Sequence, residues 1–132
     1  MPEKATLRRA RQDRRAGKAS STQAGEFVRE EIHHVREGKH GARSTKQAIA
    51  IGLSKARRAG VKLAPPPATA KASTKRSARS ASHAASKGAR PSRRRSEAMR
   101  QALKREPRST ASSKALSRQA KTSARRRRHL AS

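Results

Sequence analysis

Large apolar residues recur at helical spacing in one stretch of the first half of the chain. Val28, Ile32 and Val35 follow one another at intervals of four and three residues, and Phe27 widens their stripe. Such a stripe forms one face of an amphipathic helix, and the pattern predicts a helix over residues 23–37.

A second stretch combines a stripe of apolar residues with two small residues beside it. The stripe and the small residues are Ile49, Leu53, Ala56, Ala48 and Gly52. Small side chains permit a close approach between helices, and the pattern predicts a second helix over residues 45–59.

Capping residues support both helices. The candidate starts and stops are Ser21 or Thr22 and Gly38 for the first helix, and Ser44 with Gln47, followed by Gly60, for the second. A serine three residues before a glutamine is typical of a capping box, and glycine readily adopts the left-handed conformation that ends a helix. The connection over residues 38–43 is short enough to make the helices neighbours, which predicts an αα-hairpin.

The chain changes character at the prolines of residues 65–67. Before them lie 16 Lys or Arg and 6 acidic residues, and from there on lie 20 Lys or Arg and 2 acidic residues. The expected fold class is therefore all-α, a small αα-hairpin at residues 21–64 flanked by a basic arm at residues 1–20 and a basic tail at residues 65–132. Both flanks are expected to be largely disordered, and any core is expected to lie before the prolines.

One short helix is expected within the tail, which otherwise mixes Ala, Ser, Lys and Arg. Ser96 can cap it, Met99 and Leu103 are four residues apart, and Pro107 stops its continuation. These signals predict a helix over residues 97–105. Because two helices make a thin core, self-association through the hairpin and folding upon binding both remain open.

Charge dominates the composition. The 132 residues include 36 Lys or Arg and 8 Asp or Glu, giving a net charge of +28 and an isoelectric point of about 12.0. Such a polycation binds polyanions by releasing their condensed counterions. One Phe, no Trp and no Tyr argue against recognition by base stacking, which favours duplex DNA over single strands. We expect a cytoplasmic protein at the nucleoid, with no membrane partner.

Two groups of residues are candidates for nucleic-acid contact. The tail contributes Arg93, Arg94, Arg95, Arg125, Arg126, Arg127 and Arg128. The second helix and its flanks contribute Arg43, Lys46, Gln47, Lys55, Arg57, Arg58 and Lys62. A helix-turn-helix reading would bring Ser44, Thr45, Lys46 and Gln47 to base edges, but such motifs have a tighter turn and a third helix, so non-specific contact is preferred.

The histidines do not predict a metal site. His33, His34 and His40 lie near Glu30 and Glu37 in sequence, but adjacent histidines point in different directions and no third well-spaced ligand is evident. We expect exposed histidines paired with glutamates on the helix, with no metal and no cofactor. Because no nucleophile elbow, phosphate loop or apolar carboxylate pair is present, an enzyme is not expected.

Residues 38–60, GKHGARSTKQAIAIGLSKARRAG, resemble a domain of unknown function found in small basic bacterial proteins, most specifically over residues 47–57. Versions of that domain carry the labels DNA-binding or plasmid-stabilising. Lys55 departs from the acidic residue typical of its position. The tail resembles the linker-histone-like tails of bacterial chromatin proteins. Neither resemblance implies a catalytic residue.

These observations favour a non-specific nucleic-acid-binding protein of the nucleoid-associated, DNA-compacting type. Two alternatives stay open. The chain could be an RNA-binding or ribosome-associated basic protein, or a protein-interaction hairpin with a tail that localises it.

Overall fold

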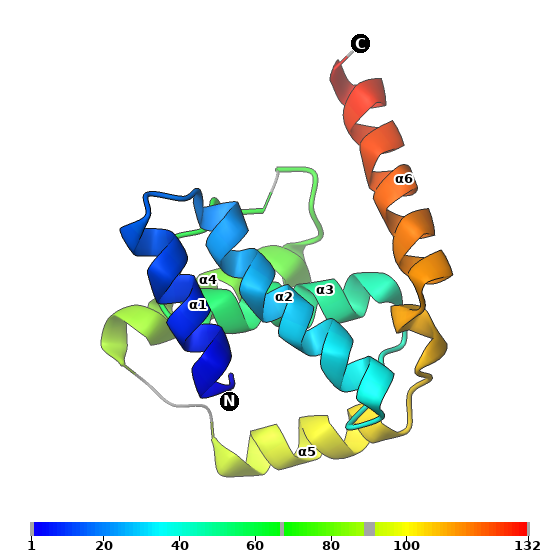
Figure 1. The fold of residues 1–132 in the computed structure, drawn as a ribbon, viewed down its shortest axis with the longest axis horizontal. Helices are drawn as coiled ribbons and strands as arrows, with labels where there is room; N and C mark the ends of the chain where they lie inside the picture. Colours follow the sequence, from blue (N-terminus) through cyan, green and yellow to red (C-terminus); the bar gives the residue numbers. More distant parts are fainter. Residues whose placement is uncertain (1, 67, 89–91, 132) are drawn as a thin grey trace.

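The chain is all-α over the residues that the computed structural model describes, which are 2–66, 68–88 and 92–131 (Figure 1). The elements are α1 Lys4–Arg15, α2 Ser20–Glu37, α3 Thr45–Arg58, α4 Ala72–Lys87, α5 Arg93–Lys104, the short 3-10 helix η1 Ser109–Ala111, and α6 Ser113–Ala131. Of the expected proline spacer, Pro67 lies outside the described residues.

The expected hairpin is present as α2 and α3, which pack against each other. Gly38 ends α2 with φ 80°, as predicted. The hydroxyl of Ser44 accepts a 3.1 Å hydrogen bond from the backbone N–H of Gln47, which confirms the cap of α3. The Gln47 side-chain oxygen accepts from the N–H of Arg43, at 2.6 Å. Gly60, with φ 99°, follows the last turn of α3.

The predicted start of the first helix was wrong by three residues. Helix α2 already begins at Ser20, so Ser21 and Thr22 lie inside it, and no side chain caps its start. Helix α3 ends at Arg58, one residue before the predicted end.

The prediction of disordered flanks is wrong. Residues 4–15 form α1, which packs against α2, and α4 packs against α3. The element η1 contacts α2, α3 and α6, and α6 also contacts α3. The hairpin is therefore the centre of a larger helical assembly (Figure 1).

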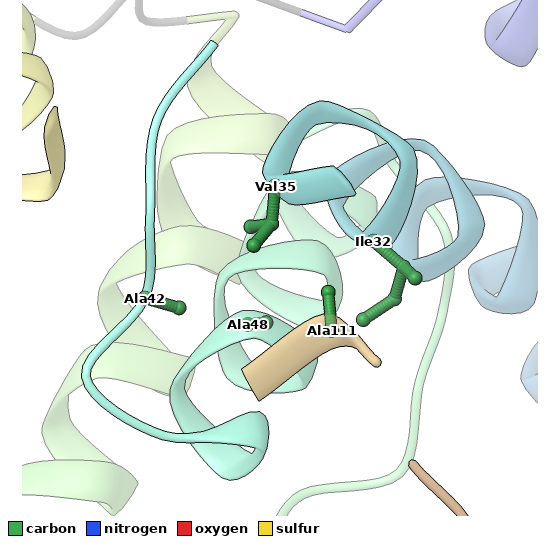
Figure 2. Close-up of a cluster of buried hydrophobic side chains, with 5 residues drawn as sticks. All are labelled: Ile32, Val35, Ala42, Ala48 and Ala111. Atoms are coloured by element: carbon green, nitrogen blue, oxygen red, sulfur yellow. The ribbon is translucent and has the colours of Figure 1, made fainter. Parts of the chain in front are cut away.

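Two small clusters of buried side chains form the core. Figure 2 shows the first, in which Ile32 and Val35 of α2 gather with Ala48 of α3, Ala42 of the connecting loop and Ala111 of η1. The second joins α1, α2 and α3 through Ala10, Ala24, Phe27 and Ala56. Because Ala111 is buried and Leu116 packs against the first cluster, the expectation that the core lies wholly before the prolines is wrong.

Hydrogen bonds hold the segment after α5 against the hairpin. The backbone N–H groups of Gly41 and Ala42 donate to the carbonyls of Leu103 and Pro107, at 2.7 and 3.0 Å. The Arg108 guanidinium donates to two carbonyls at the end of α2. The Val35 carbonyl also accepts from the backbone N–H of Gly38, so a tail residue adds to the hydrogen bonds at the end of α2.

The loop fits this segment only because residue 41 is a glycine. A Cβ atom at Gly41 would lie 1.7 Å from the carbonyl oxygen of Glu106. No side chain can be accommodated at that separation, so Gly41 sets the close contact between the hairpin loop and the end of α5.

The short helix predicted in the tail exists but starts earlier than predicted. Helix α5 begins at Arg93, capped by Ser92, whose hydroxyl accepts from the N–H of Arg95 at 3.4 Å. Ser96 therefore lies within the helix and is not its cap. Among the described residues α5 packs against no other helix; Leu103 near its end is buried and Met99 is 58% exposed.

Helices α2 and α3 approach closely at Gly52, as the small residues predicted. Gly52 is buried, and a Cβ atom there would lie 2.6 Å from the Cα of Val28. Since that neighbour is backbone, the two helices would have to separate to admit a methyl group.

Replacing the two helical glycines by alanine should have opposite effects. Gly52→Ala should lower the free energy of unfolding by about 1–3 kcal/mol, because the methyl group overpacks the contact with Val28. Gly25→Ala is the matched control, since nothing lies within 4 Å of its Cβ position in α2. It should raise stability by up to about 1 kcal/mol through helix propensity. Urea denaturation measures both, and equal effects would contradict the close approach.

Candidate nucleic-acid interface

Helix α6 displays the most uniform basic surface of the described chain. Its exposed residues Lys114, Arg118, Lys121, Arg125 and Arg128 follow at intervals of four and three. That spacing places them along one face of the helix. The helix carries no acidic residue, and its C-terminal part extends beyond the other helices (Figure 1).

Of the predicted arginines, Arg125–Arg128 all lie exposed in the last turns of α6. The sequence interpretation found this run but missed Lys114, Arg118 and Lys121. The four-three spacing of these residues is the signal in the sequence that indicates a basic helical face.

Helix α1 carries a second exposed basic stripe. Lys4, Arg8, Arg11 and Arg15 are exposed and follow the same four-three spacing. Arg9 differs because its guanidinium donates to the Glu26 carboxylate at 3.0 Å. The segment predicted to be a flexible arm is thus a helix that packs on α2 and has a basic face.

The predicted cluster Arg93, Arg94 and Arg95 occupies the first turn of α5, and all three are exposed. Cations at a helix start are opposed by the positive end of the helix dipole. A phosphate bound at this turn would interact favourably with the positive end of the helix dipole, and it would reduce the repulsion among the three guanidinium groups.

Some of the residues predicted to contact nucleic acid on and around α3 are exposed, and others are hydrogen-bonded or ion-paired within the protein. Arg43, Lys46, Arg58 and Lys62 are exposed. Arg57 is partly buried, and its guanidinium donates to the Ala64 carbonyl at 2.9 Å. The first group can reach a ligand, whereas Arg57 holds the chain that leaves α3.

Lys55 is partly buried, with 26% of its side chain exposed. Its ammonium group forms an ion pair with Glu31 of α2, whose side chain is fully buried. Glu31 also accepts from Nε2 of His40 at 3.1 Å. Lys55 therefore neutralises a buried charge, and we leave it out of the interface.

The start of α3 is partly covered by the segment after α5. Thr45 is 9% exposed, and its hydroxyl donates to the Thr110 carbonyl at 2.6 Å. The Gln47 side-chain oxygen is occupied by Arg43. Ser44 and Lys46 remain exposed, but η1 packs on this end of α3, so the surface that a helix-turn-helix reading requires is partly covered.

The histidines deviate from the prediction of exposed pairs. His33 is exposed, but His34 and His40 are half-buried. Nε2 of His34 lies 3.1 Å from a Glu3 carboxylate oxygen, and its Nδ1 lies 3.9 Å from Glu31. Glu31 is a partner on the same helix, three residues before His34, whereas tertiary structure supplies Glu3, which precedes α1.

The pKa of the Glu3 carboxyl is lowered from its usual value, chiefly by the hydrogen bond with His34 and further by the nearby charge of Lys39. A depressed pKa in the folded state means that this contact stabilises the fold above the ordinary pKa of a glutamate. That contribution is lost as the pH falls through the lowered pKa.

Comparison with known proteins gives a partial match. Residues 6–67 match a family of unknown function, DUF6496. The matched segment runs from α1 through α3 and includes the ion pair of Glu31 with Lys55. The chain thus resembles a domain family whose function is not known. No curated protein and no solved structure matches the chain.

Within the described part of the chain, no helix combines the length and the apolar character that crossing a bilayer requires.

Removing the Lys55 ammonium group should destabilise the fold strongly. Lys55→Met leaves the buried Glu31 carboxylate without its ammonium partner, at a cost of about 3 kcal/mol or more in the free energy of unfolding. Arg58→Met on the same helix is the control, because Arg58 is exposed and should change stability by less than about 0.5 kcal/mol. Equal urea midpoints for the two variants would show that the ion pair carries no stability.

Proposed function

We propose that this chain is a non-specific nucleic-acid-binding protein of the nucleoid-associated type, with duplex DNA as its preferred ligand. The observation that carries the proposal is helix α6, a basic helix without acidic residues whose stripe of cations is exposed. Phosphate contacts of this kind position a protein and carry no sequence information.

The dimensions of α6 suit a duplex. Its 19 residues correspond to a length of about 28 Å. The stripe from Lys114 to Arg128 spans about 21 Å at 1.5 Å per residue. An α-helix fits the major groove of B-DNA, which is about 12 Å wide, and long cationic side chains then reach phosphates on the groove walls.

Single-strand recognition has less support. Phe27 is the chain's one aromatic residue besides histidine, and it is 1% exposed within the second core cluster. Stacking on exposed aromatic rings is the usual basis of single-strand binding, so this protein lacks the surface for it. At the start of α3, the hydrogen bonds already made by Thr45 and Gln47 likewise favour contact with the DNA backbone over base readout.

The remaining exposed cations extend the surface. The α1 stripe, the first turn of α5 and the exposed residues near α3 add phosphate contacts to those of α6. A chain with several basic faces and a net charge of +28 can contact more than one duplex segment, which is the property that DNA compaction needs.

Neutralising the α6 stripe should weaken DNA binding and its dependence on salt. In the triple variant Arg118→Gln, Lys121→Gln, Arg125→Gln, the slope of log affinity against log salt should fall by about 0.9 per lost contact, hence by about 3. Fluorescence anisotropy with a labelled duplex between low and moderate salt measures this slope.

The control removes the same charge elsewhere. Lys18, Lys71 and Lys87 are exposed near the ends of other helices. Changing these three to Gln should alter the slope much less, because they lie outside the proposed stripe. Identical losses in the two triple variants would mean that net charge alone drives binding, and preference for structured RNA over duplex DNA in competition would refute the choice of ligand.

A further inference from the structure

Four of the eight acidic residues of this basic chain lie near its partly buried histidines, His34 and His40. Glu30, Glu31 and Glu37 lie on α2, and Glu3 precedes α1. Glu3, Glu30, Glu37 and His34 line one surface pocket between α1 and α2, together with Thr6 and His33. The nucleic-acid interface uses none of these groups.

Glu30, which lines this pocket, has a buried carboxylate oxygen without a hydrogen-bond partner. Glu30 is 4% exposed. Its Oε1 accepts a 2.5 Å hydrogen bond from the backbone N–H of Glu3, while its Oε2 is buried and makes no hydrogen bond. A buried, unsatisfied carboxylate oxygen is costly unless a proton or a cation occupies the place beside it.

We infer that Glu3, Glu30 and His34 form a site for a first-row divalent metal ion such as Zn²⁺. One ligand atom from each of the three residues lies within 4.8 Å of the others. The mixture of two carboxylates with one imidazole suits Zn²⁺ and its neighbours, whereas Mg²⁺ and Ca²⁺ prefer oxygen ligands alone.

The surroundings of His34 fit this role. Its Nε2 faces Glu3 at 3.1 Å, and its Nδ1 lies 3.9 Å from the buried Glu31 carboxylate. The Nε2–H of His34 donates to Glu3 at this distance, so a metal ion between the two atoms would replace that hydrogen bond once the proton moves to Nδ1, which faces Glu31. Glu31 is itself fixed by Lys55 and His40.

A second cluster, Glu31 with His34 and His40, also brings ligand atoms together, but its charge is already balanced. One Glu31 oxygen meets the Lys55 ammonium group and the other meets His40. A metal there would have to displace Lys55. At Glu30 the free oxygen needs no displacement, and the competing Lys39 near Glu3 is exposed, at 3.6 Å, and binds weakly.

The pocket also contains two arginines, which oppose a cation. Arg9 is engaged by Glu26 at 3.0 Å, and Arg29 is exposed and free to extend into solvent. The carboxylates of Glu3, Glu30 and Glu37 outnumber these two charges at the pocket wall.

Calorimetric titration of the full chain with ZnCl₂, in phosphate-free buffer near neutral pH and without nucleic acid, tests the site. We expect one Zn²⁺ per chain, a higher Tm with Zn²⁺ but not with Mg²⁺, and weaker binding at lower pH, because protons compete with the metal for its ligand atoms. Glu30→Gln should weaken binding by at least about tenfold. Glu37→Gln, in the same pocket but outside the ligand set, should bind Zn²⁺ as the unchanged chain does.

A measurement on the unchanged chain avoids dependence on variant folding. In histidine ring NMR spectra, Zn²⁺ should shift the His34 signals most, with smaller effects on His40 and His33. Absence of stoichiometric Zn²⁺ binding would overturn the inference. So would full binding by a folded Glu30→Gln variant, or loss of binding in His40→Gln with direct metal shifts at His40, which would locate the metal at Glu31.

Discussion

Close packing of small residues between α2 and α3 is the constraint on which the rest of the structure depends. Of the twelve buried apolar side chains in the described residues, eight are alanines. Alanines bury little area each, so they stabilise a fold only where backbones come close enough to exclude water. The contact of Gly52 with Val28 brings the backbones of α2 and α3 close together. Both clusters of buried side chains include residues of these two helices.

Because the apolar core is small, polar interactions between α2 and α3 contribute more to the stability of the fold. Glu31 of α2 is fully buried and meets Lys55 of α3 and His40 of the connecting loop. These two contacts fix the arrangement of α2, α3 and the loop between them, because a shift of α3 or of the loop would leave the Glu31 carboxylate unpaired in the interior. The loop between α2 and α3 contacts the end of α5 at Gly41. The position of that loop depends on the ion pair of Glu31 with Lys55, so the docking of the tail depends on it as well.

The sequence predicted the hairpin because its signals are local. Gly38 and Gly60 close α2 and α3, Ser44 caps α3, and the stripe from Val28 to Val35 faces the core region. Apart from α5, the flanking helices were not predicted, because low hydrophobicity and high charge are typical of disorder. The groups that hold them are alanines such as Ala111 and long-range hydrogen bonds such as that of Arg108 with the end of α2, which no periodicity reveals.

In the candidate interface, too, local sequence features could be predicted and tertiary contacts could not. Exposed arginine runs were evident from composition, but Lys55 was assigned to the surface because nothing in the sequence pairs it with Glu31. The acidic pocket was missed because Glu3 reaches His34 only after α1 docks.

The central claim is that the surplus positive charge is displayed by folded helices and meets DNA through α6. Amide hydrogen exchange of the full chain, alone and with a saturating duplex at low salt, tests it most directly. The account predicts protection of α2 and α3 in the free protein and additional protection concentrated in α6 when DNA is bound. A free protein in which α2 and α3 exchange at unprotected rates, or DNA binding that leaves α6 unchanged, would contradict it.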